Sequence, residues 1–239
     1  MQIKFFGCSF VQGGGLDNAT YYNFVTNKKF SDYTERENFR NKNRFSNIVA
    51  NKLQIECENF AVSQNSNENI LKQLFSEINK NVNEIYFVVL SLFSRVNWYY
   101  EKTRKEYNLN SFDNFSWNPY NNDEIMRDLF DTYKMYMSNV FNLEIQKEKI
   151  ITQIKLLDLF VKTKNSKIYW TSWENLFSEN KNITDNYILF DGLDLKEYVI
   201  ENKYQIFNHS NNICNDNHIC VPGNKKVADI IYEKLKERL

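Results

Sequence analysis

The sequence has little of the material from which several classes of protein are built. Of its 239 residues, only six are glycine, two proline, four cysteine and two histidine. Four cysteines in a chain of this length do not predict a disulfide scaffold, so free thiols are expected. No stretch approaches the roughly 20 apolar residues of a membrane span, and no signal peptide is visible. The expected location is therefore the cytoplasm.

The chain also lacks an excess of charge of either sign. Thirty Lys and Arg residues balance thirty Asp and Glu residues. This balance gives no electrostatic reason to expect a nucleic acid or an anionic membrane as a partner. Aromatic residues make up 16% of the chain, which argues against disorder. We expect one domain over residues 1–239, with insertions at about 13–44 and 95–122.

Short apolar runs alternate along the chain with segments of helical periodicity. Strands are predicted over 2–8, 53–60, 84–93, 167–173 and 187–190. Helices are predicted over 45–52, 67–79 and 123–164, the last with a break near 142–147, and again from about 227 to the end. The two insertions are expected to be largely irregular, with one short helix in the first. The alternation predicts a three-layer α/β sandwich around a parallel sheet of about five strands.

The few glycines are concentrated at the start of the chain, around a serine. Four of the six lie within MQIKFFGCSFVQGGG, residues 1–15, where an apolar run ends at Gly7-Cys8-Ser9. Chemistry in parallel α/β sheets is found beyond the carboxyl ends of the strands, where Ser9 is expected. Cys8 is expected to face the core as a small apolar residue.

A serine hydroxyl needs a base to become a useful nucleophile, and that base is most often histidine. The only candidates are His209, expected in a loop, and His218, expected in the loop before the final helix. Asp216 precedes His218 by two residues and could orient its imidazole. The sequence therefore predicts a triad of Ser9, Asp216 and His218.

Both ends of the chain together resemble a known family. GCSFVQGG at the start and D-x-H-x₄-G-x₃-(V/I)-A at the end are similar to motifs of the SGNH/GDSL hydrolases. NFAVSQNSNENI, residues 59–70, resembles the second block of that family, and VVLSLFSR resembles its third strand and the turn that follows. The resemblance implies a flavodoxin-like topology and a serine esterase, with Ser9 as nucleophile, Asp216 as acid and His218 as base.

The chain departs from the family pattern where the oxyanion is bound. Gln64 stands where the second block has a glycine whose backbone amide helps to bind the oxyanion. Ser94 stands near the position of an asparagine that supplies a side-chain donor. The backbone amide of Gln64, together with Ser94, Asn65 or Asn67, is expected to substitute. Arg95 is expected either to bind a substrate anion or to anchor the second insertion.

The function implied is hydrolysis of small acyl esters, particularly O-acetyl groups on a glycan. The second insertion is rich in Trp and Tyr, whose flat faces could bind sugars or merely form a small core. One alternative is an O-acyltransferase that uses the same triad. Another is a non-catalytic glycan-binding protein that kept the fold. The partner is an acyl ester or acylated glycan, and the sequence leaves the oligomeric state open.

No cofactor or metal is implied by the sequence. His209, Cys214, His218 and Cys220 are residue types that bind zinc. Their spacing, H-x₄-C-x₃-H-x-C, lacks the CxxC pair typical of zinc sites, so a metal site is not favoured.

Overall fold

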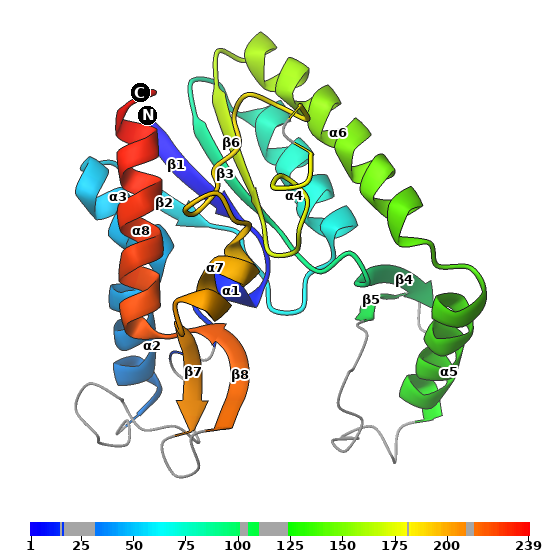
Figure 1. Ribbon diagram of the computed structural model, residues 1–239. Helices are drawn as coiled ribbons and strands as arrows, with labels where there is room; N and C mark the ends of the chain where they lie inside the picture. Colours follow the sequence, from blue (N-terminus) through cyan, green and yellow to red (C-terminus); the bar gives the residue numbers. More distant parts are fainter. Residues whose placement is uncertain (15, 17–31, 101–104, 110–123, 181, 209–212) are drawn as a thin grey trace.

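A four-stranded parallel sheet forms the centre of the molecule (Figure 1). The computed structural model describes residues 1–14, 16, 32–100, 105–109, 124–180, 182–208 and 213–239. The strands of the sheet are β1 (Gln2–Phe6), β2 (Glu56–Asn59), β3 (Ile85–Leu90) and β6 (Lys167–Ser172). Their order is β2-β1-β3-β6, and every neighbouring pair is parallel. This is the flavodoxin-like order, so the predicted α/β fold is confirmed.

The expected fifth strand is reduced to a single bridge beside β6. Trp170 pairs in parallel with Tyr187. The Trp170 N–H donates to Asn186 O at 2.9 Å, and the Ile188 N–H donates to Trp170 O at 2.8 Å. The segment predicted over 187–190 therefore lies at the expected edge of the sheet without becoming a full strand.

The sheet is buried on both faces because helices cover it on both sides. All six residues of β3 are buried, and alternate residues enter opposite halves of the core. One face is covered by α3 (Phe45–Leu53), α7 (Leu195–Glu201) and α8 (Val221–Lys236). The other is covered by α4 (Asn67–Lys80) and α6 (Leu143–Thr163). The predicted three layers are thus confirmed.

The remaining described elements lie outside this sandwich. They are α1 (Ser9–Gln12), α2 (Tyr33–Asn43), α5 (Glu124–Asn139) and two antiparallel hairpins, β4 (Val96–Tyr100) with β5 (Lys105–Leu109) and β7 (Gln205–Asn208) with β8 (Ile213–Ile219). The prediction that 95–122 is largely irregular is wrong for its first half, which forms a hairpin. Residues 17–31, 101–104 and 110–123 of the insertions lie outside the described part of the chain, as do the side chains of Trp98, Tyr99, Tyr100 and Tyr107.

The long helical segment 123–164 is broken, as expected, but slightly earlier in the chain than predicted. Helix α5 ends at Asn139 and α6 begins at Leu143. Asn142 is the N-cap of α6, and its side chain accepts a hydrogen bond from the Ile145 N–H at 3.1 Å. An asparagine here starts a new helix because its side chain satisfies an otherwise unpaired backbone donor.

One strand carries a buried charge that the sequence pattern did not predict. Lys4, in β1, is only 4% exposed. Its Nζ lies 3.2 Å from Glu77 Oε2 of α4 and 3.5 Å from Glu58 Oε2 of β2. The ammonium group is therefore compensated by two carboxylates. Within the described ranges, no helix is both long enough and apolar enough to cross a membrane.

Candidate active site

The turn between β1 and α1 presents Ser9 at the carboxyl edge of the sheet. Cys8 is the N-cap of α1 and Ser9 is its first residue. A methyl group added to Gly7 would collide with Val11 and lie 3.1 Å from Val89 O. Gly7 is thus needed for the close approach of α1 to the strands. Because β2 and β3 flank β1 on opposite sides, Ser9 lies at the topological switch point, where ligands bind in this kind of fold.

Gly14 brings the serine together with His218. A methyl group added to Gly14 would lie 2.9 Å from Ser9 Cβ and also 2.9 Å from His218 Nε2. Ser9 Cβ and His218 Nε2 therefore both lie close to Gly14, although they come from opposite ends of the sequence. Ser9 is only 6% exposed, whereas His218 is half-buried. The structure thus places two members of the predicted triad side by side.

His218 lies on a strand and not, as predicted, in a loop. It is the next-to-last residue of β8, which pairs with β7. The register passes from Gln205↔Ile219 to Ile206↔Asp216, so His218 lies at an irregularity of the hairpin. Such bulges re-aim side chains next to functional sites. The sequence suggested a loop because the segment is polar and carries no apolar alternation.

The third predicted member of the triad is described only through its backbone. Asp216 pairs with Ile206 in the β7–β8 hairpin, two residues before His218. Its side chain lies outside the described residues, as does all of His209. The role of Asp216 therefore stays a prediction.

Two aromatic side chains that the sequence analysis did not assign to the site form a stacked pair beside His218. Phe10, directly after Ser9, contacts His218 with ring centroids 5.1 Å apart. On its other side Phe10 stacks on Trp173, with centroids 3.5 Å apart and planes within 10°. Trp173 directly follows β6 and is 2% exposed. Their positions, each just after a residue at the carboxyl end of a strand, are the signal that could have identified them.

Gln64 has a backbone conformation that favours glycine, the residue that the sequence resemblance leads one to expect here. Its φ is +62°, in the left-handed region that favours glycine. The turn is closed by the Asn65 N–H, which donates to Val62 O at 3.2 Å. The Val62 N–H in turn donates to Gly7 O at 3.2 Å, so the turn lies beside the end of β1. A side chain on Gln64 has therefore not abolished the turn, and it is exposed to solvent.

Asn65 and Asn67, also predicted near the oxyanion, are both buried. The Asn65 Nδ2 donates to Gln73 Oε1 at 3.3 Å. The Asn67 side chain is clamped to the residue after β3: its Nδ2 donates to Ser91 O at 3.2 Å, and its Oδ1 accepts the Ser91 N–H at 2.6 Å. Asn67 thus fastens the start of α4 to the end of β3.

Ser94 and Arg95 lie just beyond the same point. The Arg95 Nη1 donates to Ser91 Oγ at 2.6 Å, and the carbonyl oxygen of Ser94 accepts from Tyr133 OH at 2.9 Å. Both residues therefore connect the end of β3 to surrounding segments. Ser91, which receives bonds from both Asn67 and Arg95, was not identified from the sequence, although it directly follows the most apolar strand.

The described cysteines are buried or half-buried thiols. Cys8 is fully buried in the core, as predicted. Burial raises the pKa of Cys57 to about 11, with a smaller opposing effect of Arg44, and burial also raises the pKa of Cys220. The thiols of Cys57 and Cys220 therefore stay protonated at neutral pH. Among the described residues, no group of three His, Cys, Asp or Glu side chains could hold a metal ion; His209 and the Cys214 side chain lie outside them.

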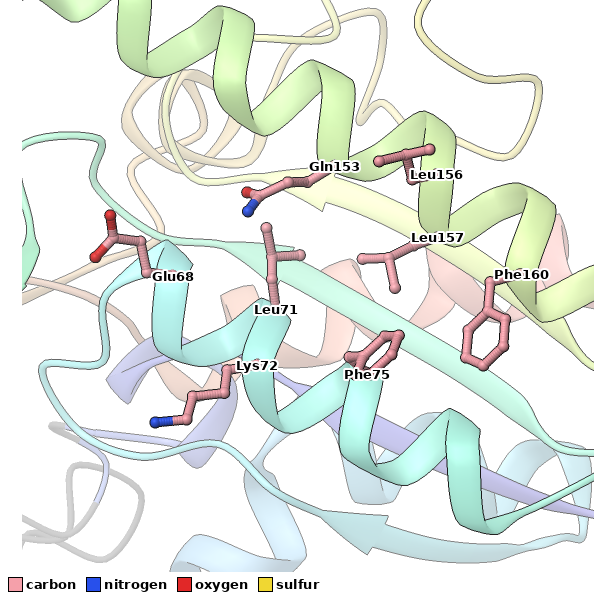
Figure 2. Close-up of a pocket in the computed structure, with 8 residues that line it drawn as sticks. All are labelled: Glu68, Leu71, Lys72, Phe75, Gln153, Leu156, Leu157 and Phe160. Atoms are coloured by element: carbon pink, nitrogen blue, oxygen red, sulfur yellow. The ribbon is translucent and has the colours of Figure 1, made fainter.

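A separate apolar pocket of about 360 Å³ lies between α4 and α6 (Figure 2). Phe75 from α4 and Phe160 from α6 close one end of it as a stacked pair, with centroids 5.3 Å apart. None of the residues that line it is a predicted site residue. It belongs to the helical layer and not to the edge at which Ser9 lies.

No protein family and no curated protein matches this chain in sequence. Solved structures do align with it. One is an acetyl xylan esterase, Est2A, from Butyrivibrio proteoclasticus, at 12% identity and a TM-score of 0.48. A second is a carbohydrate esterase described as having divergent catalytic and non-catalytic binding functions, at 13% identity and a TM-score of 0.47. A third is a family two carbohydrate esterase from Clostridium thermocellum in complex with cellohexaose, at 14% identity and a TM-score of 0.44.

Each alignment covers 99% of this chain but only 64% of the solved structure. The chain therefore spans less than two thirds of the length of these proteins. At these scores the assignment of the fold rests on the sheet order and not on the likeness.

Proposed function

We propose that the protein is a serine hydrolase that cleaves small acyl esters through an acyl-enzyme on Ser9. The observation that carries the proposal is that Ser9 Cβ and His218 Nε2 both lie 2.9 Å from the position of a methyl group added to Gly14. A serine and an imidazole from opposite ends of a chain have no structural need to meet at the switch point of the sheet. Their meeting there supports a nucleophile and its base.

In the proposed reaction, Ser9 Oγ attacks the ester carbonyl carbon while His218 Nε2 takes the hydroxyl proton. The tetrahedral intermediate collapses, the bond to the alcohol oxygen breaks, and His218 returns the proton to the departing alcohol. Water then attacks the acyl-enzyme with His218 again as base, which releases the acid and restores Ser9. Asp216 is proposed to orient the imidazole and stabilise its charged form.

The oxyanion is proposed to bind to backbone amides of Ser9 and of the Gln64 turn. The left-handed φ of Gln64 supports this, because it preserves the turn that a glycine would form. An oxyanion donor is typically worth about 10²–10³ in rate, so the quality of this turn sets much of the activity. Asn65 and Ser94 remain the proposed additional donors to the oxyanion, and Arg95 is proposed to bind a substrate anion.

The proposed acyl group is acetyl. Ser9 is 6% exposed and Gly14 lies against it, which leaves little room for a longer acyl chain. The proposal that the alcohol is a glycan rests on the family resemblance and on the aromatic composition of residues 95–122.

An O-acyltransferase would use the same residues, with a sugar hydroxyl in place of water. The low exposure of Ser9 is the observation that favours the third reading, a non-catalytic glycan-binding protein.

The test is turnover of p-nitrophenyl acetate and p-nitrophenyl butyrate, followed by acetate release from an acetylated xylo-oligosaccharide. We expect acetate to be favoured over butyrate by at least about tenfold, because a longer chain meets Gly14. Ser9→Ala and His218→Ala are each expected to lower turnover by at least about 10³-fold.

Cys8→Ser is the matched control, since Cys8 neighbours Ser9 but is buried in the core. It should keep most of the activity if the nucleophile is Ser9. Absence of turnover in folded wild-type protein, with retained affinity for the oligosaccharide, would replace hydrolysis by the glycan-binding reading. Acyl transfer to an added sugar in preference to water would establish the acyltransferase.

A further inference from the structure

Two asparagine side chains connect the first turn of α3 to the elements that carry the proposed catalytic residues. This turn consists here of Phe45 and Ser46, which are both fully buried. Two asparagine side chains reach it, Asn224 from the start of α8 and Asn59 from the end of β2. Each of them also bonds a second element. The two asparagines thereby link α1 and β8 to one common point.

Asn224 connects α3 to the residue that follows the histidine. Its Oδ1 accepts the Phe45 N–H at 3.0 Å. Its Nδ2 donates to Ile219 O at 2.8 Å and to Cys220 O at 3.2 Å. Because Ile219 directly follows His218, this side chain fixes the backbone on which the imidazole is carried. Asn224 is 1% exposed, so water does not replace these bonds when they are lost.

Asn59 makes the corresponding connection to the helix of the serine. Its Nδ2 donates to Ser46 Oγ at 2.9 Å and to Val11 O at 3.1 Å. Val11 lies in α1, two residues after Ser9. The Asn59 Oδ1 accepts the Ala61 N–H at 2.9 Å, which holds the start of the segment that leads to the Gln64 turn.

Neither catalytic element is itself a strand of the central sheet. Among the described residues, β8 pairs with β7 alone, and α1 is a single turn. The hairpin approaches α8 closely at Gly223, where an added methyl group would lie 2.6 Å from Tyr204 Cβ and 2.7 Å from Ile219 Cγ2. The distance between Ser9 and His218 is therefore set by packing and by side-chain hydrogen bonds, and not by backbone hydrogen bonds between paired strands.

We propose that the first turn of α3 is the common anchor that sets the position of His218 relative to Ser9, with Asn224 and Asn59 as positioning residues. The inference rests on the proposed function for its catalytic consequence, but its structural content is independent of activity. A misplacement of about 1 Å in an active site can cost about 10²-fold in rate. Loss of either asparagine is thus expected to reduce the chemical step more than substrate binding.

The experiment compares Asn224→Ala and Asn59→Ala with Asn43→Ala. Asn43 is a buried asparagine whose side chain donates to Phe39 O within its own helix, so it controls for lost stability alone. We expect each positioning variant to lower kcat by about 10–10²-fold with KM changed less than about threefold. Asn43→Ala should keep kcat within about twofold at temperatures where it is folded.

A second readout does not need activity. The chain has two histidines, so side-chain NMR signals of His218 can be assigned with His218→Ala. We expect Asn224→Ala to shift or broaden the His218 signals, and Asn43→Ala to leave them in place. If Asn224→Ala does not fold, Asn59→Ala, which is only half-buried, carries the same expectation.

A folded Asn224→Ala or Asn59→Ala protein with wild-type kcat and wild-type His218 signals would overturn the inference. If the wild type itself has no esterase activity but Asn224→Ala still displaces the His218 signals, the anchor stands and the proposed function falls. The two failures are therefore distinguishable.

Discussion

Gly14 is the residue on which the geometry of the proposed site depends most directly. An alanine methyl group would lie 2.9 Å from both Ser9 Cβ and His218 Nε2, closer than non-bonded carbon atoms normally approach. We predict that Gly14→Ala separates the two side chains and lowers kcat by about 10²-fold, while the fold persists. Ester turnover and circular dichroism of the variant would check this.

Gly192→Ala is the control for this substitution. Gly192 has φ +89° and no heavy atom within 4 Å of an added methyl group, so the variant strains the backbone without touching the site. It should lower the melting temperature and leave kcat unchanged. If Gly14→Ala had wild-type kcat, the proposal that His218 acts as the base for Ser9 would be contradicted.

Gln64 gives a second prediction at the residue scale. A non-glycine residue at φ +62° carries strain of about 1 kcal/mol, which glycine does not. We predict that Gln64→Gly raises the melting temperature by about 2–4 °C for a protein of this size, and keeps esterase activity. Gln64→Ala, which retains the strain, is the comparison in the same thermal denaturation experiment.

A lower melting temperature for Gln64→Gly would mean that the glutamine side chain stabilises the turn. A loss of activity without a loss of stability would mean that this side chain, and not only its backbone, takes part in the site. Either result would contradict the view that Gln64 replaces a glycine through its backbone alone.

At the scale of elements, β1 and α4 are joined by the ion pair of buried Lys4 with half-buried Glu77. Burial raises the pKa of Glu77, but hydrogen bonds from Lys80 and Lys4 outweigh it, so its pKa lies below the usual 4.5. A carboxylate with a lowered pKa in the folded state stabilises the fold above the pKa of its unfolded state, and this contribution is lost as the pH falls.

We predict that Glu77→Gln lowers the free energy of unfolding at pH 7 by about 1–3 kcal/mol, because Lys4 loses a charged partner. The difference from the wild type should shrink as the pH falls below about 4.5. Urea denaturation at several pH values measures it. Glu144→Gln is the matched control, because Glu144 is 77% exposed and 3.9 Å from Lys147; it should change stability by less than about 0.5 kcal/mol.

The core elements were the most predictable from the sequence, because their residues carry a pattern that burial requires. The predicted helix over 67–79 is α4, Asn67–Lys80, and Ser66 caps it by accepting the Asn69 N–H at 3.3 Å. The fully apolar 85–90 run is the central strand β3. In each case local periodicity and tertiary burial favour the same structure.

The hairpins could not be predicted in the same way. β4–β5 and β7–β8 lie outside the sandwich, so no buried face imposes an alternation on their sequences. The burial of Lys4 could not be predicted either. A charged residue is tolerated in this buried strand because Glu77 and Glu58, from other elements, pair with it. Such compensation is a tertiary property that a local pattern does not contain.

At the scale of the whole molecule, the site is assembled from the two ends of the chain. Figure 1 shows both termini at the same end of the sheet, with β1 leading away from that end and α8 returning to it from the side of β7 and β8. Lys167 Nζ, at the start of β6, lies 2.7 Å from Arg238 O and so ties the C-terminus to that end. Ser9, which follows β1, and the end of β8, which precedes α8, therefore lie close together.

The motifs at both ends predicted which residues would meet, but not how they are held together. The roles of Phe10, Trp173, Asn59 and Asn224 depend on contacts between segments far apart in the chain. Phe10 contacts His218 and stacks on Trp173. Asn224 bonds the residue after His218 to α3, whereas Asn59 bonds α1 to α3.

The central claim is that Ser9 is a nucleophile activated by His218. The measurement that tests it most directly is labelling of the folded protein with a fluorophosphonate, followed by mass spectrometry of the intact chain and its peptides. We predict a single adduct on the peptide that contains Ser9, absent in Ser9→Ala and slowed by at least about 10²-fold in His218→Ala. No adduct on folded wild-type protein, or an equal rate in His218→Ala, would contradict the claim.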